Sequence, residues 1–335
     1  MFARWMIAAL AATALASAHA ADAPITMKLS TPTPPNDVSV DWMKAFKAGV
    51  DARAPGRMKI EIYPASQLGQ IPRTIEGVLM NTIELTAVAV GFLNEVEPRY
   101  RVFDAPGIFD DIAHSARTLQ DPEIRKRFAS FGTARNVEPL ATFVNGPLVV
   151  VSRKPIREIA DFKGMKLRIP GPGPLQVEPL KRMGGAPLSM GLGEVLPAVQ
   201  NRTIDGAMAS IAVFTGFKYF DTVKAMTNLP GSWLVVGCLV NRGYMKSLGP
   251  ELEAIVRDEA HKAAETVVGP RATEDTARDY KTWQSNGGEV INFSAAESKR
   301  YLAEVDAVLQ PILAANPQMK EDYEALVAAA KRHRR

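Results

Sequence analysis

The sequence has very few residues of the kinds that carry redox or metal chemistry. It holds one cysteine, Cys238, and four histidines, of which His114, His261 and His333 are isolated from one another. A single thiol cannot form an internal disulfide, and scattered histidines lack the spacing of a zinc or iron site. Cys238 lies inside an apolar run, which favours a small buried hydrophobic residue over a nucleophile. We therefore expect no metal and no cofactor.

The sequence also lacks the short motifs of common enzymes. It has no G-x-S-x-G elbow, no S-x-x-K pair, no P-loop and no G-x-G-x-x-G. The glycine-rich stretch 191–194 misses the third glycine, and the adjacent acids Asp110 and Asp111 are typical of a helix cap or a solvated loop. The residues thus indicate no catalytic function, and we assign no catalytic residue.

Long hydrophobic runs are missing after the N-terminus. Arg4, the apolar run 6–15 and the tripeptide 18–20 fit a secretory signal peptide that is cut near Ala20. A membrane anchor needs a longer apolar segment, and no later stretch provides one. We therefore expect a periplasmic protein from which residues 1–20 have been removed.

Neither sign of charge dominates the chain. Its 40 basic and 36 acidic residues give a net charge of +4, and most of the excess lies in residues 331–335. A body with interspersed acids and bases argues against nucleic acid as a partner. We interpret the basic end as a solvated helix terminus.

What the sequence does have is a repeated alternation of strand and helix patterns, typical of an α/β chain with largely parallel, buried strands. Strands are expected at 25–29, 58–63, 83–90, 165–169, 186–190, 204–209, 234–240 and 290–293, and helices at 42–50, from 71, from 122, and at 175–183, 194–201 and 252–267. The apolar runs 140–144 and 148–151 flank an Asn-Gly-Pro segment, which we interpret as a crossing between two lobes. The Gly-Pro pair 269–270 is expected to end the helix before it.

The most informative stretch is 155–210, which contains PIREIADFKGMKLRIPGPGP and then APLSMGLGEVLPAVQNRTIDGAMAS. These segments strongly resemble the DctP-type solute receptors of tripartite ATP-independent periplasmic (TRAP) transporters. The matching positions are Pro155, Ile156, Asp161, Lys163, Gly164, Lys166, Arg168, Pro170, Pro187, Met190, Glu194, Val195, Ala198, Gln200, Asp205 and Gly206. Segments 56–69 and 102–106 resemble the first-lobe signatures of the same family.

The resemblance implies a fold of the periplasmic binding protein type, with two α/β lobes, mixed sheets, hinge strands and a long connecting helix. We place the first lobe at 21–145 plus 234–270, the second at 146–233 plus 271–310, and a C-terminal helix with a basic tail at 311–335. It also implies a receptor that captures a small organic carboxylate between the lobes. The receptor would deliver this acid to the small and large membrane subunits of a TRAP transporter for ion-driven uptake.

The resemblance identifies Arg168 as the main partner of the substrate carboxylate. Arg168 ends a strand before a Gly/Pro loop, where open α/β sheets bind ligands, and its planar guanidinium can hold both carboxylate oxygens. A structural arginine paired with Asp161 or Glu194 is the alternative. The other candidate ligand-binding residues are Leu148, Met190, Leu192, Ala209, Ser210, Phe214 and Trp233, with Thr31, Gln70, Glu84 and Thr86 on the first lobe.

Three positions depart from family members that bind ligands like sialic acid. Leu148 replaces an arginine, Leu192 an aromatic residue and Ala209 an asparagine. A ligand dense in hydroxyls would leave its own groups unpaired against this lining. We therefore predict a less polar carboxylate, namely an aromatic acid, a short keto or hydroxy acid, or a branched aliphatic acid.

Two other classes of function stay open at this point. The first is a secreted hydrolase or lyase that acts on a small acid in the same cleft. The second is the input module of a sensor kinase or the receptor of an ATP-driven importer. Neighbouring genes for small and large membrane subunits would favour the TRAP receptor.

Overall fold

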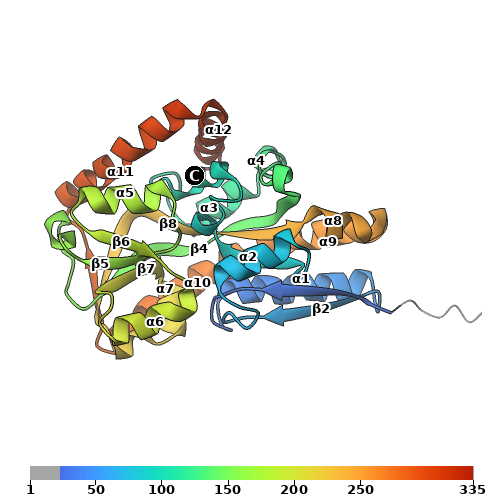
Figure 1. Ribbon diagram of the computed structural model, residues 1–335, viewed down its shortest axis with the longest axis horizontal. Helices are drawn as coiled ribbons and strands as arrows, with labels where there is room; N and C mark the ends of the chain where they lie inside the picture. Colours follow the sequence, from blue (N-terminus) through green and yellow to red (C-terminus); the bar gives the residue numbers. More distant parts are fainter. Residues whose placement is uncertain (1–22, 335) are drawn as a thin grey trace, which may run out of the picture.

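The computed structural model describes residues 23–334, so the expected signal peptide lies outside the described residues. Over this range nine strands form one sheet in the order β2-β1-β3-β8-β4-β7-β5-β6, with β9 beside β8. The long strands β4 (Val137–Ser152) and β8 (Ala225–Asn241) are antiparallel and run through the middle of the sheet. Figure 1 shows the two lobes on either side of these strands.

The first lobe is built on β1 (Ile25–Ser30), β2 (Met58–Tyr63) and β3 (Leu85–Ala89), where β1 is parallel to both neighbours. Strand β3 then pairs with the second half of β8, and the first half of β4 forms the edge of this lobe. Its helices are α1 (Val38–Arg53), α2 (Ile71–Leu79), η1 (Val90–Phe92), η2 (Pro98–Asp104), α3 (Ile112–Leu119), α4 (Pro122–Phe128), η3 (Thr133–Arg135), α8 (Arg242–Ser247) and α9 (Gly249–Ala263).

The first-lobe core forms where the predicted apolar stripe of α1 meets α9. Trp42 and Phe46 are fully buried and stack with ring centroids 5.6 Å apart. The indole N–H of Trp42 donates to the carbonyl of Ala260, at 3.0 Å, so the aromatic residue has a partner for its polar atom. This contact fixes α9 against α1.

The second lobe is built on β5 (Lys166–Ile169), β6 (Ala186–Ser189), β7 (Gly206–Ser210) and β9 (Glu289–Asn292). Strand β5 is parallel to β6 and β7, whereas β7 is antiparallel to β4, so the sheet is mixed, as expected. Its helices are η4 (Ile159–Phe162), α5 (Pro174–Arg182), α6 (Leu192–Gln200), α7 (Ile211–Gly216) and η5 (Tyr219–Asp221).

The crossing between the lobes agrees with the prediction for 140–151, because both apolar runs lie in the single strand β4. Its register against β8 shifts on both sides of Asn145, so β4 bends where it changes lobes. The sequence missed the first half of β8, where Pro230 and Gly231 interrupt the strand pattern. Gly231 has a φ of +60°, and its carbonyl accepts the N–H of Gly107 at 2.9 Å.

The prediction that the Gly-Pro pair 269–270 ends a helix is wrong. Helix α9 continues through a π-helical turn, Ala264–Val268, directly into α10 (Gly269–Ser285). Because proline lacks an N–H, Pro270 fits the first turn after the π segment, where the regular i to i−4 bonding has already been interrupted. The resulting long helix contacts α3 of the first lobe and α7 of the second.

Two further helices bind the lobes together from outside. Helix α11 (Ala295–Ala315) packs on α5 of the second lobe, and α12 (Pro317–His333) packs on α3, α4 and η2 of the first lobe (Figure 1). Ser294 caps α11 by accepting the backbone N–H of Glu297 at 3.2 Å. The carboxylate of Glu297, however, accepts the backbone N–H of Ile159 at 2.8 Å instead of completing a capping box.

The basic end of the chain is exposed, as expected of a solvated helix terminus, and its side chains also dock on acids of the first lobe. Arg334 donates two hydrogen bonds of 2.7 Å to the carboxylate of Asp110. His333 and Arg332 both contact the carboxylate of Asp121, at 2.9 and 3.1 Å. Acids at the start of α3 and α4 therefore hold the last turn of α12.

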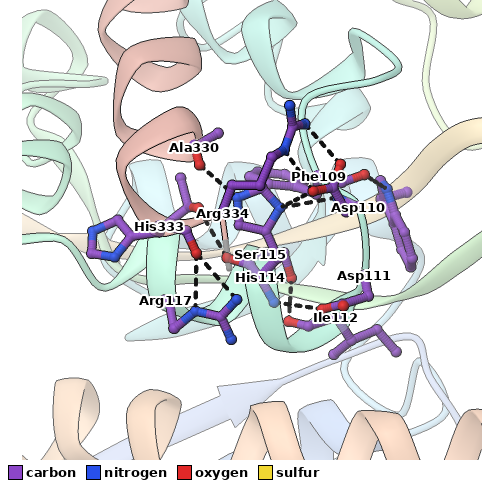
Figure 2. A network of polar contacts seen from close by, with 12 residues as sticks. Phe109, Asp110, Asp111, Ile112, His114, Ser115, Arg117, Ala330, His333 and Arg334 are labelled. Atoms are coloured by element: carbon purple, nitrogen blue, oxygen red, sulfur yellow. Dashed lines mark hydrogen bonds and ion pairs between the residues drawn. The ribbon is translucent and has the colours of Figure 1, made fainter.

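Figure 2 shows that His114 lies in the middle of this docking site and has a structural role. Its side chain is buried, and Nδ1 accepts the backbone N–H of Asp110 at 3.0 Å. Nε2 therefore carries the proton and donates to the carbonyl of Ala330 at 2.7 Å. Asp111 caps α3 by accepting the N–H of His114, as its position predicts.

Residues 23–334 contain neither a candidate membrane-spanning helix nor a candidate metal site. None of their helices is long and apolar enough to cross a membrane. Nor do they bring three or more histidine, cysteine, aspartate or glutamate side chains together in an arrangement that suits a metal ion.

Candidate functional site

A cavity of about 30 Å³ lies between the lobes at the carboxyl end of β5. The second lobe contributes Arg168, Pro170, Leu192, Ala209 and Val213, the first lobe Pro32, Thr33, Ile71, Ala87, Val88, Ala89 and Phe92, and the crossing strand β8 Leu234 and Val236. The carboxyl ends of strands from both lobes therefore meet at one small, mostly apolar space.

Arg168 is the one cationic side chain among the described residues that line this cavity. It is 2% exposed, and it is held by two backbone carbonyls. Its Nε donates to Met190 at 3.2 Å and its Nη1 to Met208 at 2.8 Å. Burial lowers the pKa of Arg168 to about 10, so the guanidinium stays charged at neutral pH. The ring of Phe92 lies 5.8 Å from it.

The two acids that could have paired with Arg168 are engaged elsewhere. The carboxylate of Asp161 accepts the N–H of Arg157 at 2.7 Å, and that of Glu194 accepts the N–H of Gly191 at 3.0 Å as a helix cap. Within residues 23–334, no acidic side chain forms an ion pair with Arg168. A buried cation without a counter-ion is costly, and an anionic ligand would remove that cost.

Three of the predicted site residues, Arg168, Leu192 and Ala209, line the cavity. Two more lie close to it. Met190 supplies the carbonyl that holds Arg168, and Gln70 packs on the backbone of the second lobe. A β-carbon added to Gly193 would lie 2.7 Å from the side-chain nitrogen of Gln70, which shows how closely the lobes meet there.

Three first-lobe candidates lie outside the lining, and their roles as ligand contacts stay predictions. The Thr31 hydroxyl lies 3.0 Å from that of Thr33, which does line the cavity. Glu84 accepts the backbone N–H of Lys28 at 2.7 Å. Thr86 donates to the hydroxyl of Thr74 at 3.0 Å, and both are buried.

Two second-lobe candidates and one on β8 also have other neighbours. Leu148 lines a separate small hollow of about 20 Å³. Phe214 packs edge to face on Tyr219, with ring centroids 4.9 Å apart. Trp233 donates from its indole nitrogen to the carbonyl of Phe109 at 3.0 Å. These side chains pack on or hydrogen-bond to other parts of the fold, and direct contact with a ligand remains a prediction for each of them.

Ser210 belongs to a buried polar network at the crossing between the lobes. Its hydroxyl donates to the side-chain oxygen of Asn145, whose amide nitrogen donates to both carboxylate oxygens of Asp37 at 2.9 and 3.0 Å. Burial raises the pKa of Asp37, although these hydrogen bonds oppose the shift. The network joins the start of α1 to the bend of β4 and the end of β7.

Sequence reasoning missed Thr33, Ile71, Phe92 and Val213. All four follow or flank the carboxyl end of a strand, or lie in the first turns of the next helix. The rule that ligands bind at the carboxyl ends of strands could have identified that region. It could not have identified the individual side chains, because they come from segments far apart in the sequence that meet only in the folded structure.

A much larger hollow lies elsewhere, a groove of about 830 Å³ between α4, α9 and the edge of β4. Its walls carry both signs of charge. Arg53 pairs with Glu259 at 3.0 Å, and Arg257 pairs with Glu138. This groove shares no lining residue with the cavity at Arg168, and unlike Arg168 its Arg53 and Arg257 already have acidic partners.

Comparisons with known proteins agree with the fold and with the sequence resemblance. A DctP family profile, described as bacterial extracellular solute-binding protein, family 7, matches residues 29–316. The 2,3-diketo-L-gulonate-binding periplasmic protein of Escherichia coli is 27% identical over 221 residues, which cover 66% of this chain and 67% of that protein. A solute-binding protein of Verminephrobacter eiseniae is 27% identical over 289 residues, covering 86% and 85%.

Among solved structures, a TRAP periplasmic solute-binding protein from Desulfovibrio salexigens with bound orotic acid has the same fold. It superposes with a TM-score of 0.85 at 23% identity, over 92% of this chain and 99% of that one. Since the family profile covers most of the chain, this protein belongs to the DctP family of bacterial extracellular solute-binding proteins.

Proposed function

We propose that this protein is an extracytoplasmic receptor that binds a small organic carboxylate beside Arg168 and delivers it to TRAP membrane subunits. The observation that carries the proposal is the buried guanidinium, which has no acidic partner within residues 23–334. A ligand carboxylate would complete this ion pair. Family membership, and the acids named for several relatives, support the same function.

The hydrogen bonds of Arg168 leave part of its donor set for a ligand. Two N–H groups, one on Nε and one on Nη1, are taken by the carbonyls of Met190 and Met208. The carbonyls fix the plane of the guanidinium, and the remaining N–H groups can hold both oxygens of one carboxylate. In a closed, water-poor cavity, removing one partner of such a pair costs about 2–5 kcal/mol of binding free energy.

Because residues from both lobes line the cavity, a bound acid would stabilise the closed arrangement, which the membrane subunits would recognise. We retain the lobe boundaries 21–145 plus 234–270 and 146–233 plus 271–310 as a proposal. The change of partner strand along β4 and β8 supports the boundaries near 146 and 234. The boundary near 270 falls inside one continuous helix, so closing must bend or twist that helix.

We further infer that residues 1–20 direct export to the periplasm, with cleavage near Ala20, and that the receptor is not an enzyme. The export pattern of the N-terminus and the periplasmic names of relatives support the first inference. The second is supported by the cavity wall, whose described polar side chains are Arg168 and Thr33. Turnover of a bound acid by the purified protein would favour the hydrolase or lyase instead.

Native mass spectrometry of the protein purified from its host, followed by calorimetry with the acid that it carries, tests the proposal. Arg168→Gln should abolish binding. Arg182→Gln removes an exposed arginine that pairs with Glu304 at 2.7 Å, and it should leave binding unchanged. Equal affinity in the wild type and in Arg168→Gln would contradict the proposed site.

A further inference from the structure

We infer that the solute is a short aliphatic monocarboxylate and that the receptor discriminates against dicarboxylates and sugar acids. The inference rests on the proposed function, because it takes Arg168 as the site of the ligand carboxylate. It adds the number of hydroxyl groups, the charge and the size of the ligand that the other residues of the cavity wall favour. Three features of the wall carry it: its polar side chains, its charge and its size.

The described residues that line the cavity offer no unused side-chain partner for a ligand hydroxyl once Arg168 holds the carboxylate. Apart from Arg168, only Thr33 brings a polar side chain to the wall. The hydroxyl of Thr33 already lies 3.0 Å from that of Thr31 and also bonds to the buried carboxylate of Asp37. Each hydroxyl of a sugar acid would thus lose its water without a replacement, which weakens binding on the order of tenfold.

The wall also has a single positive charge to offer. A second ligand carboxylate would lie against Leu192, Val213 or Phe92, all of which are buried. An anion in such surroundings has neither a counter-ion nor hydrogen-bond donors from side chains. A dicarboxylate should therefore bind at least about a hundredfold more weakly than a monocarboxylate of the same length.

The size of the space limits the ligand further. About 30 Å³ is far below the roughly 300–1,000 Å³ of pockets for drug-sized ligands, so the lobes must part somewhat even to admit a short acid. The two lobes already touch beside the cavity. The backbone of Gly91 lies against that of Pro170, and the backbone of Gly193 lies against the side chain of Gln70. A larger or flatter ligand would separate more of these interlobe contacts, which favours a compact alkyl chain over an aromatic ring.

The alkyl part of such an acid has a defined place. Leu192 begins α6 and Val213 lies in α7, both on the second lobe, and Phe92 and Ile71 face them from the first. Burying a short branched chain between these four side chains gains about 0.8 kcal/mol for each methylene group, that is, roughly fourfold in affinity. Leu192 and Val213 are the specificity-determining residues in this arrangement.

Calorimetry on ligand-free mature protein tests the ligand class with isovalerate, succinate, galacturonate and benzoate, and with isoamyl alcohol as the uncharged control. Isovalerate should bind at least a hundredfold more tightly than each other compound. Equal or tighter binding of succinate, galacturonate or benzoate, lost in Arg168→Gln, would overturn the ligand class and leave the proposed function intact. Binding of none of the acids would likewise overturn the ligand class alone, whereas binding that survives Arg168→Gln would overturn both.

A matched pair of valine substitutions tests the wall itself. Val213→Thr places a hydroxyl against the alkyl chain with little change of shape, and it should weaken isovalerate binding about tenfold. Val195→Thr makes the same change at a buried position of α6 outside the cavity, and it should leave affinity unchanged. Equal affinity of the two variants would refute the assignment of Val213.

Discussion

The backbone of Gly91 meets that of Pro170 across the two lobes. A β-carbon added to Gly91 would lie 2.7 Å from the carbonyl oxygen of Pro170, closer than real β-carbon contacts. Gly91 lies in η1 directly after β3, and Pro170 directly follows β5. Pro170 itself and Phe92, which follows Gly91, line the cavity, so this contact lies at its edge.

Gly91→Ala should weaken ligand binding about tenfold or more, because the added methyl group holds the closed lobes apart while the open form is unaffected. Calorimetry measures the affinity, and small-angle scattering should show a more open ligand-bound particle. Gly146→Ala is the control, since its β-carbon would meet its nearest neighbour, Ser210, at an ordinary 3.5 Å. Unchanged affinity in Gly91→Ala would mean that the contact is not needed for closure.

Arg168→Met should abolish binding and at the same time raise the stability of the ligand-free protein. The wild-type guanidinium is buried without an acidic partner in residues 23–334, and an apolar side chain of similar length avoids that cost. We expect the free energy of unfolding to rise by about 1–2 kcal/mol in urea titrations. A less stable ligand-free variant would show that the bonds to Met190 and Met208 outweigh the desolvation of the charge.

Asp104 should make ligand affinity depend on pH. Its carboxylate accepts a hydrogen bond from the amide of Gln176 across the lobes at 2.9 Å. Burial raises the pKa of Asp104 to about 6, although the bonds from Gln176 and Asn94 and the charge of Arg101 oppose the shift. In an open, hydrated form the pKa would be near 3.9.

The closed form therefore binds the extra proton, and protonation favours closing. This contribution is complete below about pH 4 and is lost as the pH rises through about 6. Affinity measured by calorimetry should be about fourfold higher at pH 5.5 than at pH 7.5. Asp104→Asn keeps the shape of the side chain and should flatten the profile, and a persisting pH dependence in that variant would assign it to another group.

The docked C-terminus should contribute stability that is lost in acid. Partial burial would raise the pKa of Asp121, but hydrogen bonds from His333 and Arg332 outweigh it and hold the pKa at about 2. A lowered pKa means stability that is present above about pH 3.9 and disappears as the pH falls toward 2. Asp121→Asn retains a helix-capping side chain and loses the ion pairs.

We expect Asp121→Asn to lower the free energy of unfolding by about 1 kcal/mol at pH 7, and by less in high salt, because Arg332 is half exposed. The difference between variant and wild type should shrink between pH 5 and pH 2. A difference that is independent of pH would mean that capping of α4, not the charge, is what the substitution disturbs.

Local sequence patterns predicted most of the strands and the crossing at 140–151, because β-branched and apolar runs there are buried on both faces of a sheet. They failed at β8 and at Pro270. Pro230 and Gly231 hid half of a strand, since the sequence cannot show that Gly107 from another segment supplies their backbone partner. Pro270 was interpreted as the end of a helix, because the π-helical turn that precedes it has no recognisable sequence pattern.

For the site, the motif around Arg168 singled out the arginine that lines the interlobe cavity, whereas its surroundings required the structure. Whether Asp161 or Glu194 paired with it depended on local capping bonds that spacing does not reveal. The prediction named Thr31, whereas Thr33, two positions later, is the threonine that lines the cavity. The hydroxyls of the two residues are 3.0 Å apart. Phe92 and Val213 belong to different lobes, and only the fold brings them to one cavity.

The placement of α12 has a consequence for synthesis of the protein. The contact between His114 and Ala330 joins residues 216 positions apart, so the first lobe lacks its outer helix until nearly all of the described chain has left the ribosome. Contacts this distant in sequence form late and slow folding. An incomplete nascent chain would therefore expose the apolar faces of α3 and η2, and during that interval it should be a substrate for chaperones.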